Sequence, residues 1–519
     1  MAQLQWLQRM WQELHELPIN SLLSLLFCLF SILFIFKLLR RGKPKYHLPP
    51  SPPKLPIIGN LHQFGSLPHR SLRVLSKKYG PVMLLELGHV NTLVVSSVDM
   101  ARELMKTQDI DFANRPQNTA AKILLYGCTD IGFAHYGEYW RQAKKICVLE
   151  LLSIKRVQSF QHIREEEVAV LGDKIRKACV TQTPVNVSEM LIEISDNIIS
   201  RCTLGQKIAE EDGKMTFGQL SRQVMVQLMK FCLGDFFPYL AWVDVLTGFI
   251  SSVEGTFKEL DRFFDQVIED HKTIMESGVV DQSNKKDFVD ILLHLQRDGM
   301  LDFAFTKDNL KAILLDMFLG GADTTSTALE WIMAELIKNP KIMKKAQDEI
   351  RGIVGKKSHI DLDDISKMDY LKCVINESLR LHPPTTLLTP RETATTVKFG
   401  GYDIPPKTTV FVNTWAIQRD PAVWENPDEF IPERFKNSPF DFRGQDFEFH
   451  PFGGGRRKCP GLAFAAASLD FLIANLLCWF DWRLPGDNVK PEDLDMDEIY
   501  GLTVPKKHHL YAIPTLYSA

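Results

Sequence analysis

A glycine- and arginine-rich loop with one cysteine lies about sixty residues before the C-terminus. It runs Phe452-Gly-Gly-Gly-Arg-Arg-Lys-Cys459-Pro-Gly461 and leads into the apolar stretch Leu462–Phe480. Glycines let a backbone approach a sulfur or a flat ligand closely. A single thiolate can hold haem iron and favours O–O cleavage there. The other interpretation is a buried structural cysteine near a turn, the usual fate of a solitary cysteine. The loop alone leaves both interpretations open.

The cysteines and the net charge exclude several classes of protein. The chain has 519 residues, 45% of them hydrophobic and 24% charged, which is typical of a globular protein with an ample core. Its nine cysteines are odd in number and scattered, without a C-x-x-C pair, so they fit neither a disulfide framework nor a zinc site. They favour a reducing compartment. A net charge of −3 gives no reason to expect nucleic-acid binding.

The N-terminal region predicts a membrane anchor. Leu17–Phe36 carries no charge, and as a helix at ~1.5 Å per residue it would span roughly 30 Å, the thickness of the bilayer hydrocarbon. Basic residues follow it at 37–45, so the positive-inside rule places a short N-terminus in the lumen and the rest in the cytosol. A cleaved signal peptide is the rival interpretation, but the apolar run is too long and its basic flank lies on the wrong side.

A proline-rich hinge at 48–60 follows the anchor. Five of the eight residues Pro49–Pro56 are prolines, which excludes a helix or an inner strand and predicts a stiff extended spacer. A disordered linker or an SH3 ligand is the alternative. The sequence therefore predicts two parts: 1–47 with the lumenal stub, the anchor at about 17–36 and a basic linker, and a cytosolic domain at 48–519.

The body of the chain has no second linker, so we expect one large, mostly helical domain with a small β-rich part. Val82–Leu87 and Thr92–Ser96 are predicted strands, joined by Gly88–Asn91. Shorter strands are expected near Val397–Phe399 and Thr409–Asn413.

A long helix is expected from Lys307 to about Asn339, with Thr306 as its N-cap. Inside it lies Gly320-Gly-Ala-Asp-Thr-Thr325, and two glycines plus two threonines cost ~2 kcal/mol of helix propensity. Such a weak point marks a local opening or a functional site. The Thr324 hydroxyl can bond the Gly320 carbonyl and open a groove. Glycines packed against another helix are the equally weighted alternative.

A second helix, Leu371–Leu381, places Glu377 and Arg380 on one face at i, i+3. An exposed pair of this kind would contribute under ~1 kcal/mol. By itself the pattern is weak.

Together these motifs resemble the cytochrome P-450 monooxygenases. The cysteine loop matches the family's haem signature at its five fixed positions, and Gly320–Thr325 matches its oxygen-activation motif. The helix pair followed by Pro-Glu-Arg434-Phe matches its three-way ion-pair network. The resemblance covers nearly the whole chain and is closest to plant microsomal members of the A-type group.

The resemblance assigns roles by position. It implies haem b with Cys459 as the axial iron ligand, within a loop whose Phe452 and Gly455 belong to the signature. Thr324 would relay protons for oxygen activation, and Asp323 would supply them. Buried Glu377, Arg380 and Arg434 would form the structural network. The expected partners of the haem propionates are Trp140, Lys144, Arg391 and Arg457; Lys144 stands where relatives commonly have arginine and lacks the bidentate fork.

The implied fold is a triangular helical prism with haem between long helices. The implied reaction inserts one atom of O₂ into a small lipophilic plant metabolite of terpenoid, phenylpropanoid, coumarin or alkaloid type, with electrons from NADPH through a cytochrome P-450 reductase, and cytochrome b5 as a second donor. The implied location is the endoplasmic reticulum membrane, with a single span. Pocket residues are expected at Phe318, Leu319, Ala322, Thr386, Leu387, Leu388 and Leu502.

Two other functions stay open at this point. A haem-thiolate isomerase or dehydratase would not need NADPH, and Thr324 counts against it. A non-catalytic haem-binding protein would need no proton relay, and the Gly320–Thr325 run counts against that.

Overall fold

The computed structural model describes residues 23–25, 27–32, 46–207, 217–277, 286–298, 303–444, 446–486 and 489–518. The chain divides into two compact units, Met1–Leu48 and Pro49–Ala519. Most of the predicted span at 17–36 lies outside the described residues; 23–25 and 27–32 are helical. Among the described residues, one single helix, Leu462–Trp479, is long and apolar enough to cross a membrane, and it is largely buried, as expected for a core helix.

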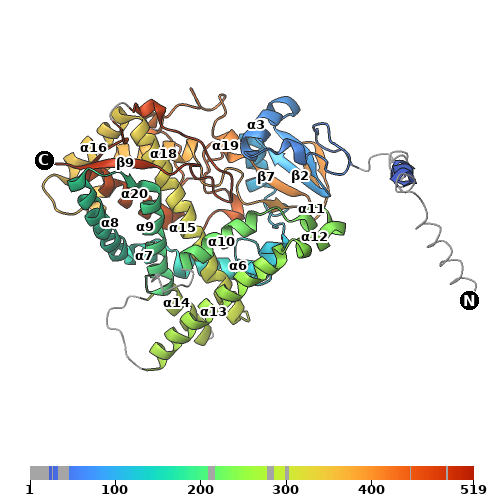
Figure 1. Ribbon diagram of the computed structural model, residues 1–519, viewed down its shortest axis with the longest axis horizontal. Coiled ribbons are helices and arrows are strands. Elements are labelled where there is room, and N and C mark those ends of the chain that lie inside the picture. The colour runs from blue at the N-terminus through green and yellow to red at the C-terminus, as the bar shows by residue number, and fades with distance from the viewer. Residues whose placement is uncertain are drawn as a thin grey trace, which may run out of the picture. The chain divides into compact units, whose positions relative to one another are not determined.

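The second unit is mostly helical, as predicted (Figure 1). Its α-helices are α3 (Pro68–Tyr79), α4 (Val98–Arg102), α5 (Thr119–Leu124), α6 (Glu138–Ile146), α7 (Ile154–Ser159), α8 (Gln161–Thr181), α9 (Val187–Leu204), α10 (Phe217–Met229), α11 (Leu233–Phe236), α12 (Ala241–Leu246), α13 (Phe249–Glu276), α14 (Phe288–Arg297), α15 (Lys307–Lys338), α16 (Pro340–Val354), α17 (Leu362–Ser366), α18 (Asp369–Leu381), α19 (Thr414–Ile417) and α20 (Leu462–Trp479).

Short 3-10 and π-helical turns join these helices. They are η1 (Leu61–Gln63), η2 (Glu103–Thr107), η3 (Cys147–Leu151), η4 (Pro238–Leu240), η5 (Pro432–Phe435), η6 (Gly455–Arg457) and η7 (Pro491–Asp493). The turn η6 belongs to the cysteine loop and η5 to the Pro-Glu-Arg-Phe segment.

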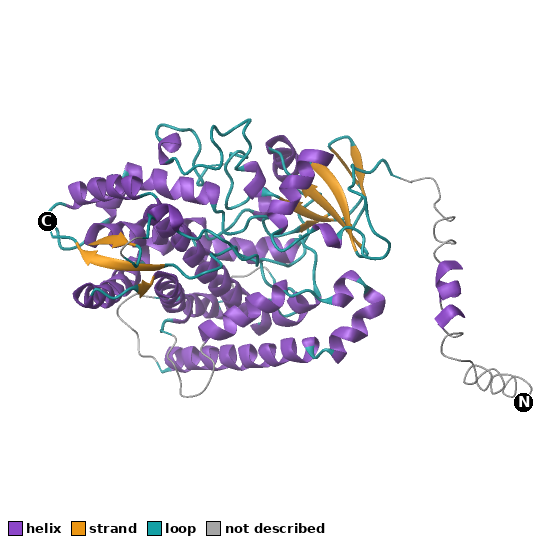
Figure 2. Cartoon of the chain, turned by 45° about the horizontal axis from the view of Figure 1, so that its top comes forward, coloured by secondary structure: helices purple, strands orange, loops and turns teal. Residues whose placement is uncertain are grey.

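The strands form three small sheets, drawn in orange in Figure 2. They are β1 (Val82–Leu87), β2 (Val90–Val95), β3 (Val185–Asn186), β4 (Arg391–Glu392), β5 (Val397–Phe399), β6 (Tyr402–Ile404), β7 (Thr409–Val412), β8 (Phe480–Arg483) and β9 (Tyr511–Leu516). The sheet orders are β1-β2-β7-β4, β3-β9-β8 and β5-β6. In the first sheet, β1 and β2 are antiparallel and β2 runs parallel to β7.

The connection between β1 and β2 is shorter than predicted. The second strand begins at Val90 rather than Thr92, because a two-residue turn at Gly88 and His89 joins the strands. Gly88 has φ +60°, a backbone conformation that tight hairpin turns need and that glycine adopts without strain. The predicted four-residue connection was wrong because it overlooked this turn.

Helix α15 runs through the core, in contact with α9, α18 and α20. Its predicted start is confirmed: Thr306 and Asn309 form a reciprocal capping box, and the helix continues unbroken to Lys338. Most of its side chains are buried, including Leu310, Phe318 and Trp331. The helix is continuous through the glycine pair Gly320–Gly321.

Candidate active site

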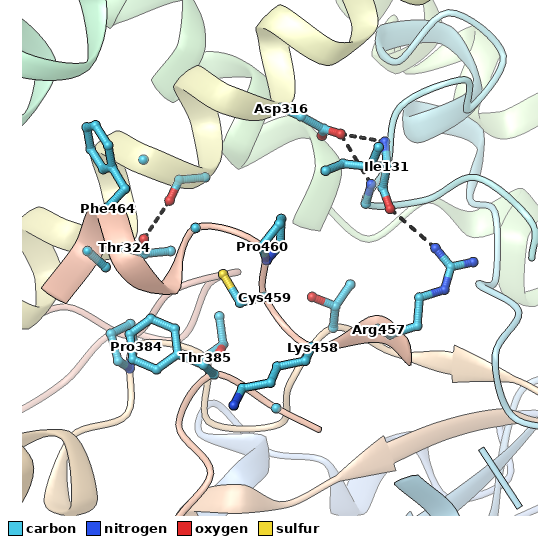
Figure 3. Close-up of a pocket in the computed structure, with 18 of the residues that line it drawn as sticks. Ile131, Asp316, Thr324, Pro384, Thr385, Arg457, Lys458, Cys459, Pro460 and Phe464 are labelled. Atoms are coloured by element: carbon cyan, nitrogen blue, oxygen red, sulfur yellow. Dashed lines mark hydrogen bonds between the residues drawn. The ribbon is translucent and has the colours of Figure 1, made fainter. Parts of the chain in front are cut away.

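A cavity of about 290 Å³ lies between α15 and the cysteine loop. Its walls come from α15, from the loop between α5 and α6, from the segment 384–391 and from the start of α20. Figure 3 shows Cys459 and Thr324 at this cavity, with Asp316, Ile131 and Arg457 toward its other end. Residues far apart in the sequence thus share one enclosed space.

The cysteine loop presents one sulfur to this cavity. The Cys459 N–H donates to the carbonyl of Phe452 (3.0 Å), which closes the loop on itself. Cys459 is exposed and lines the cavity. Burial raises the pKa of the Cys459 thiol, while the Gly461 N–H and the charges of Lys144 and Lys458 oppose that shift. A buried thiol of this kind becomes a thiolate most readily when a metal cation binds it.

Gly455 is required by the close packing of the loop. Its φ is +67°, and a Cβ there would lie 2.2 Å from the carbonyl oxygen of Met105 and 2.4 Å from Oδ1 of Asp109. Any side chain would push the loop away from the segment that carries Asp109. Phe452 also lines the cavity, and its ring lies against Phe442 (centroids 5.4 Å apart).

Buried cations gather along one side of the cavity. Arg457 donates to the carbonyls of Ala113 (2.7 Å) and Ala134 (2.5 Å), and its guanidinium lies over the Trp140 ring, 4.1 Å from the centroid. Arg391 donates to Asp109 Oδ1 (2.9 Å) and to the carbonyl of Gly454 (2.7 Å).

Arg115 joins this group. It donates to the carbonyls of Gly132 (3.0 Å), Thr389 (2.5 Å) and Pro390 (2.7 Å). Sequence reasoning missed it, because its only signal is an arginine before a proline in the Phe-Ala-Asn-Arg-Pro segment at 112–116, far from every motif.

These cations destabilise one another. Burial, and then Arg391, lowers the pKa of Arg457 to about 9. Burial together with Arg457 and Arg391 lowers the pKa of Arg115 well below its usual range. An anionic group beside them would offset both effects. The two propionates of haem fit this set of three guanidiniums beside the Trp140 ring.

Lys144 sits differently from the prediction. Its Nζ donates to the carbonyl oxygens of Arg456 and Lys458 and lies 5.0 Å from the centroid of the Trp140 ring. Burial, and then the charge of Arg457, lowers its pKa to about 8. Lys144 therefore braces the backbone on both sides of Arg457, although it also reaches the cavity wall.

On the opposite wall, α15 presents Gly320 and Thr324. The Thr324 hydroxyl donates to the carbonyl of Gly320 (2.6 Å), as the sequence predicted. Asp323 points elsewhere: its carboxylate accepts a hydrogen bond from the Thr503 hydroxyl. Burial raises the pKa of Asp323, and the Thr503 bond and the charge of Arg222 oppose the shift. A carboxyl group one residue from Thr324 is thus biased toward holding a proton.

The predicted ion-pair network lies away from the cavity walls. Arg380 donates to both oxygens of Glu377 (2.7 and 2.8 Å), and Arg434 donates to Oε1 of Glu377 (2.9 Å). The side chains of Glu377 and Arg380 have no exposed area. The pair predicted from spacing is therefore fully buried, joined to η5 through Arg434.

Comparison with known proteins assigns the family. The model of the family described as Cytochrome P-450 matches residues 49–512. The chain belongs to the cytochrome P-450 family. A phenylacetaldehyde oxime monooxygenase from Prunus mume is 53% identical over 100% of both chains. Desmethylyatein synthase from Sinopodophyllum hexandrum is 49% identical over 94% of this chain and 97% of the relative.

Solved structures agree with this assignment. A zebra fish cytochrome P-450 in a structure with abiraterone aligns with a TM-score of 0.72 at 25% identity, covering 88% of this chain and 100% of that one. The chain is therefore a cytochrome P-450 monooxygenase of the plant A-type group, with the family's fold and its haem-thiolate cofactor.

Within this cytochrome P-450, one of the seven expected pocket residues, Leu388, lines the cavity. On α15 the lining residues recur every three to four positions from Asp316 to Ala328, so a different face points inward from the one predicted. The other six predicted residues are not among the described residues that line the cavity: Phe318, Leu319, Ala322, Thr386, Leu387 and Leu502.

Packing explains two of these differences. Phe318 turns away from the cavity, and its ring lies edge-on to Phe217 (centroids 4.5 Å apart). Leu387 belongs to the hydrophobic cluster of Met83 and Leu85 on β1. Their neighbours Met317, Thr385 and Thr389 line the cavity instead.

Proposed function

We propose that the chain is an NADPH- and O₂-dependent haem-thiolate monooxygenase that oxidises a small lipophilic plant specialised metabolite. The observation that carries this proposal is the shared cavity of Cys459, Thr324 and the buried cations. One wall offers a thiol for iron, the facing helix offers a hydroxyl, and one side offers charges for carboxylates. Haem held by a thiolate supplies oxygen activation by favouring O–O cleavage.

Cys459 is the proposed axial ligand. Arg391, Arg457 and Arg115 are proposed to hold the propionates, because they supply unbalanced positive charge at one side of the cavity. Trp140 is proposed to complete this side; its indole N–H donates to the carbonyl of Ile131, and its ring lies under the Arg457 guanidinium. Phe452 and Gly455 shape the loop around the sulfur. Lys144 is assigned to the loop backbone, with its charge near the sulfur.

Thr324 and Asp323 are proposed to handle protons. The Thr324 hydroxyl is at the cavity wall and Asp323 is buried behind it, in contact with Thr503. Since burial favours the neutral form of Asp323, this carboxyl can hold a proton, and Thr324 can pass one on at the cavity wall. Both are general-acid roles.

The substrate is proposed to be neutral and largely apolar, of terpenoid, phenylpropanoid, coumarin or alkaloid type. Beside the cations, the cavity wall includes Ile131, Met317, Ala328, Pro384 and Leu388. Named relatives include the phenylacetaldehyde oxime monooxygenase and a costunolide synthase from Cichorium intybus, 46% identical over 91% of this chain and 94% of the relative. These names support a lipophilic plant metabolite as substrate.

The proposed electron donor is NADPH–cytochrome P-450 reductase, with cytochrome b5 as a second candidate. Arg141, Lys145 and Arg456 are exposed near the cysteine loop, and Lys458 is half-buried beside them. A basic surface at this point would attract an acidic partner. Arg141 is paired with Glu138 and Arg456 with Asp109, so Lys145 and Lys458 would contribute most.

The chain is proposed to sit on the endoplasmic reticulum membrane through a single anchor at about 17–36, with 48–519 in the cytosol. Exposed apolar side chains support contact of this unit with lipid, at Leu55 and Ile57 in the hinge and at Trp242 and Leu246 in α12. These segments are close together, because Gly59 bridges to β1 and the backbone after β1 bonds α11. Apolar and aromatic side chains of this kind favour the bilayer interface.

The first test is the carbon-monoxide difference spectrum of the reduced protein beside a Cys459→Ala variant. The proposal expects the long-wavelength band of thiolate-ligated haem, lost in the variant. A short-wavelength band in folded protein would exclude Cys459 as the ligand. Product formed only with NADPH and O₂ would then establish the monooxygenase; turnover without them would indicate an isomerase or dehydratase, and no turnover a non-catalytic haem protein.

A further inference from the structure

A fully buried carboxyl group and a half-buried one meet beside the cavity, and none of the roles above uses them. Asp316 is on α15 at the cavity wall, and Asp130 is on the loop between α5 and α6 with no exposed area. Besides burial, the negative charge of Asp130 acts directly on Asp316 and raises its pKa. A methyl group in place of the Gly132 hydrogen would lie 3.0 Å from Oδ2 of Asp130 and 3.5 Å from Oδ1 of Asp316. The two acids thus converge on one glycine.

The same two acids bind the backbone of the loop. Asp316 Oδ2 accepts hydrogen bonds from the N–H groups of Ile131 (2.6 Å) and Gly132 (3.2 Å). Asp130 Oδ2 accepts one from the N–H of Phe133 (2.7 Å). Three successive amide groups are therefore turned toward the pair.

The carbonyl of Ile131 points the other way. It accepts hydrogen bonds from Trp140 Nε1 (2.9 Å) and from Arg457 Nη1 (3.3 Å). The single peptide group between Ile131 and Gly132 therefore joins Asp316 at its N–H to Arg457 at its C=O. Figure 3 shows Asp316, Ile131 and Arg457 in this order. Hydrogen bonds in a chain polarise one another. The charge of Asp316 therefore affects the hydrogen bond between the Ile131 carbonyl and Arg457.

Two ionised carboxylates that both approach Gly132, one of them without exposed area, repel each other strongly where little water screens them. A proton between them removes the repulsion. It also fills a gap, since Oδ1 of Asp130 has no donor among the described residues unless Asp316 provides one. Burial raises the pKa of Asp130 to about 6, and burial and Asp130 raise that of Asp316 well above its usual range.

The surrounding charges favour retaining one negative charge. The titratable groups that face the pair come from the loop, from α6, from η3 and from the cysteine loop: Arg115, Cys128, Tyr139, Cys147 and Arg457. Only the two arginines are cations. Their positive charge stabilises one carboxylate but does not offset two in contact.

We propose that Asp130 and Asp316 hold one proton between them and act as positioning residues, which fix the Ile131–Gly132 peptide group so that its carbonyl keeps Trp140 and Arg457 in place at the haem cavity. The proposal rests on the haem-binding role assigned above to Arg457. It goes further because Asp316, on α15, then helps to hold the propionate-binding residues in place.

Infrared spectroscopy of the purified holoenzyme tests the shared proton. A protonated carboxyl group has a carbonyl stretch that shifts in D₂O, and a carboxylate has none in that region. Asp130→Asn and Asp316→Asn keep the shape of the side chain and give the remaining acid an amide donor. Each single variant is expected to lose the same one-carboxyl signal, and the double variant no more than either.

Two infrared outcomes would overturn the proposal. If the double variant loses no signal, the pair holds no proton. If the double variant loses twice the signal of a single one, each acid holds its own. These outcomes are independent of turnover. They therefore stand apart from the carbon-monoxide spectrum, whose failure would refute the haem-thiolate proposal instead.

The positioning role is tested by haem release to excess apomyoglobin over a range of pH. Asp316→Ala removes the acceptor of two amides and is expected to release haem on the order of 10-fold faster, as outer-shell partners usually do. The wild type should release haem faster at alkaline pH, where the shared proton is lost. Asp316→Asn should release haem near the wild-type rate and should lack this alkaline acceleration. The control is Asp470→Asn on α20, a buried acid paired with Arg443.

The wild-type pH profile should be unchanged in Asp470→Asn. Equal release rates for Asp316→Ala and the wild type would overturn the positioning role. So would an unchanged alkaline acceleration in Asp316→Asn.

Discussion

Replacing Glu377 by glutamine should destabilise the protein strongly. Glu377 accepts hydrogen bonds from Arg380 through two donors, from Arg434 and from the N–H of Ile431. The glutamine keeps the shape but removes the charge that balances two guanidiniums. Breaking one side of a buried pair costs about 3–5 kcal/mol, because the remaining charge is left buried without a partner.

This loss of unfolding free energy corresponds to a lower melting temperature. Unfolding entropy near 60 °C is about 2.1 cal/mol/K per residue, so the roughly 470 residues of the unit Pro49–Ala519 give about 1 kcal/mol per degree. The Glu377→Gln variant is therefore expected to unfold about 3–5 °C below the wild type. Arg380 also donates to the backbone carbonyls of Gln418, Pro427 and Glu429, so part of the structure around it should loosen and release haem earlier.

The assay is thermal unfolding at one scan rate, followed by circular dichroism and by haem absorbance. The matched control is Glu433→Gln, the same substitution in η5 next to Arg434. Glu433 pairs with Lys345, and both side chains are about half exposed (46% and 54%). An exposed pair contributes under about 1 kcal/mol, so the control should shift by no more than about 1 °C. Equal shifts for the two variants would refute the reasoning from burial.

Three further outcomes are expected. Thr324→Ala should lower product formed per NADPH consumed, with Thr324→Ser near the wild type, because only the hydroxyl can pass a proton; equal yields for both would exclude the role. Gly321→Ala should destabilise the fold, since its Cβ would lie 2.6 Å from Cδ1 of Ile199. In a background that already carries Ile199→Ala, this clash and its cost should be absent. Burial would lower the pKa of His271, but Asp287 raises it to about 9. The stabilisation is therefore complete below about pH 6.5 and is lost as pH rises through about 9, a loss that melting curves of His271→Gln should lack.

The parts of the fold that the sequence predicted are those set by local signals. Thr306 and Asn309 fixed the start of α15, and the Thr324 hydroxyl bonds Gly320 within one turn. The pair Glu377 and Arg380 needed only helical spacing. Each depends on residues three or four positions apart, so periodicity and capping rules were enough.

The parts that the sequence did not predict depend on contacts across the chain. Arg115 joins the cation group because the segment 384–391 folds beside it, which no local pattern indicates. Phe318 was expected at the cavity, but its ring packs against Phe217 of α10. Lys144 was expected to face a propionate, and its donors instead hold the carbonyls around Arg457.

The glycine pair in α15 shows how two interpretations of one motif can both hold. Gly320 faces the cavity, and a Cβ there would meet no atom within 4 Å, so its small size leaves space for the hydroxyl of Thr324 and for a ligand. Gly321 packs tightly against Ile199 of α9, the helix-packing alternative. Gly320→Ala should therefore alter the cavity with little effect on stability. Gly321→Ala should lower stability with little effect on the cavity. Comparing the two variants by melting and by ligand-induced spectral change would separate function from packing at adjacent residues of one helix.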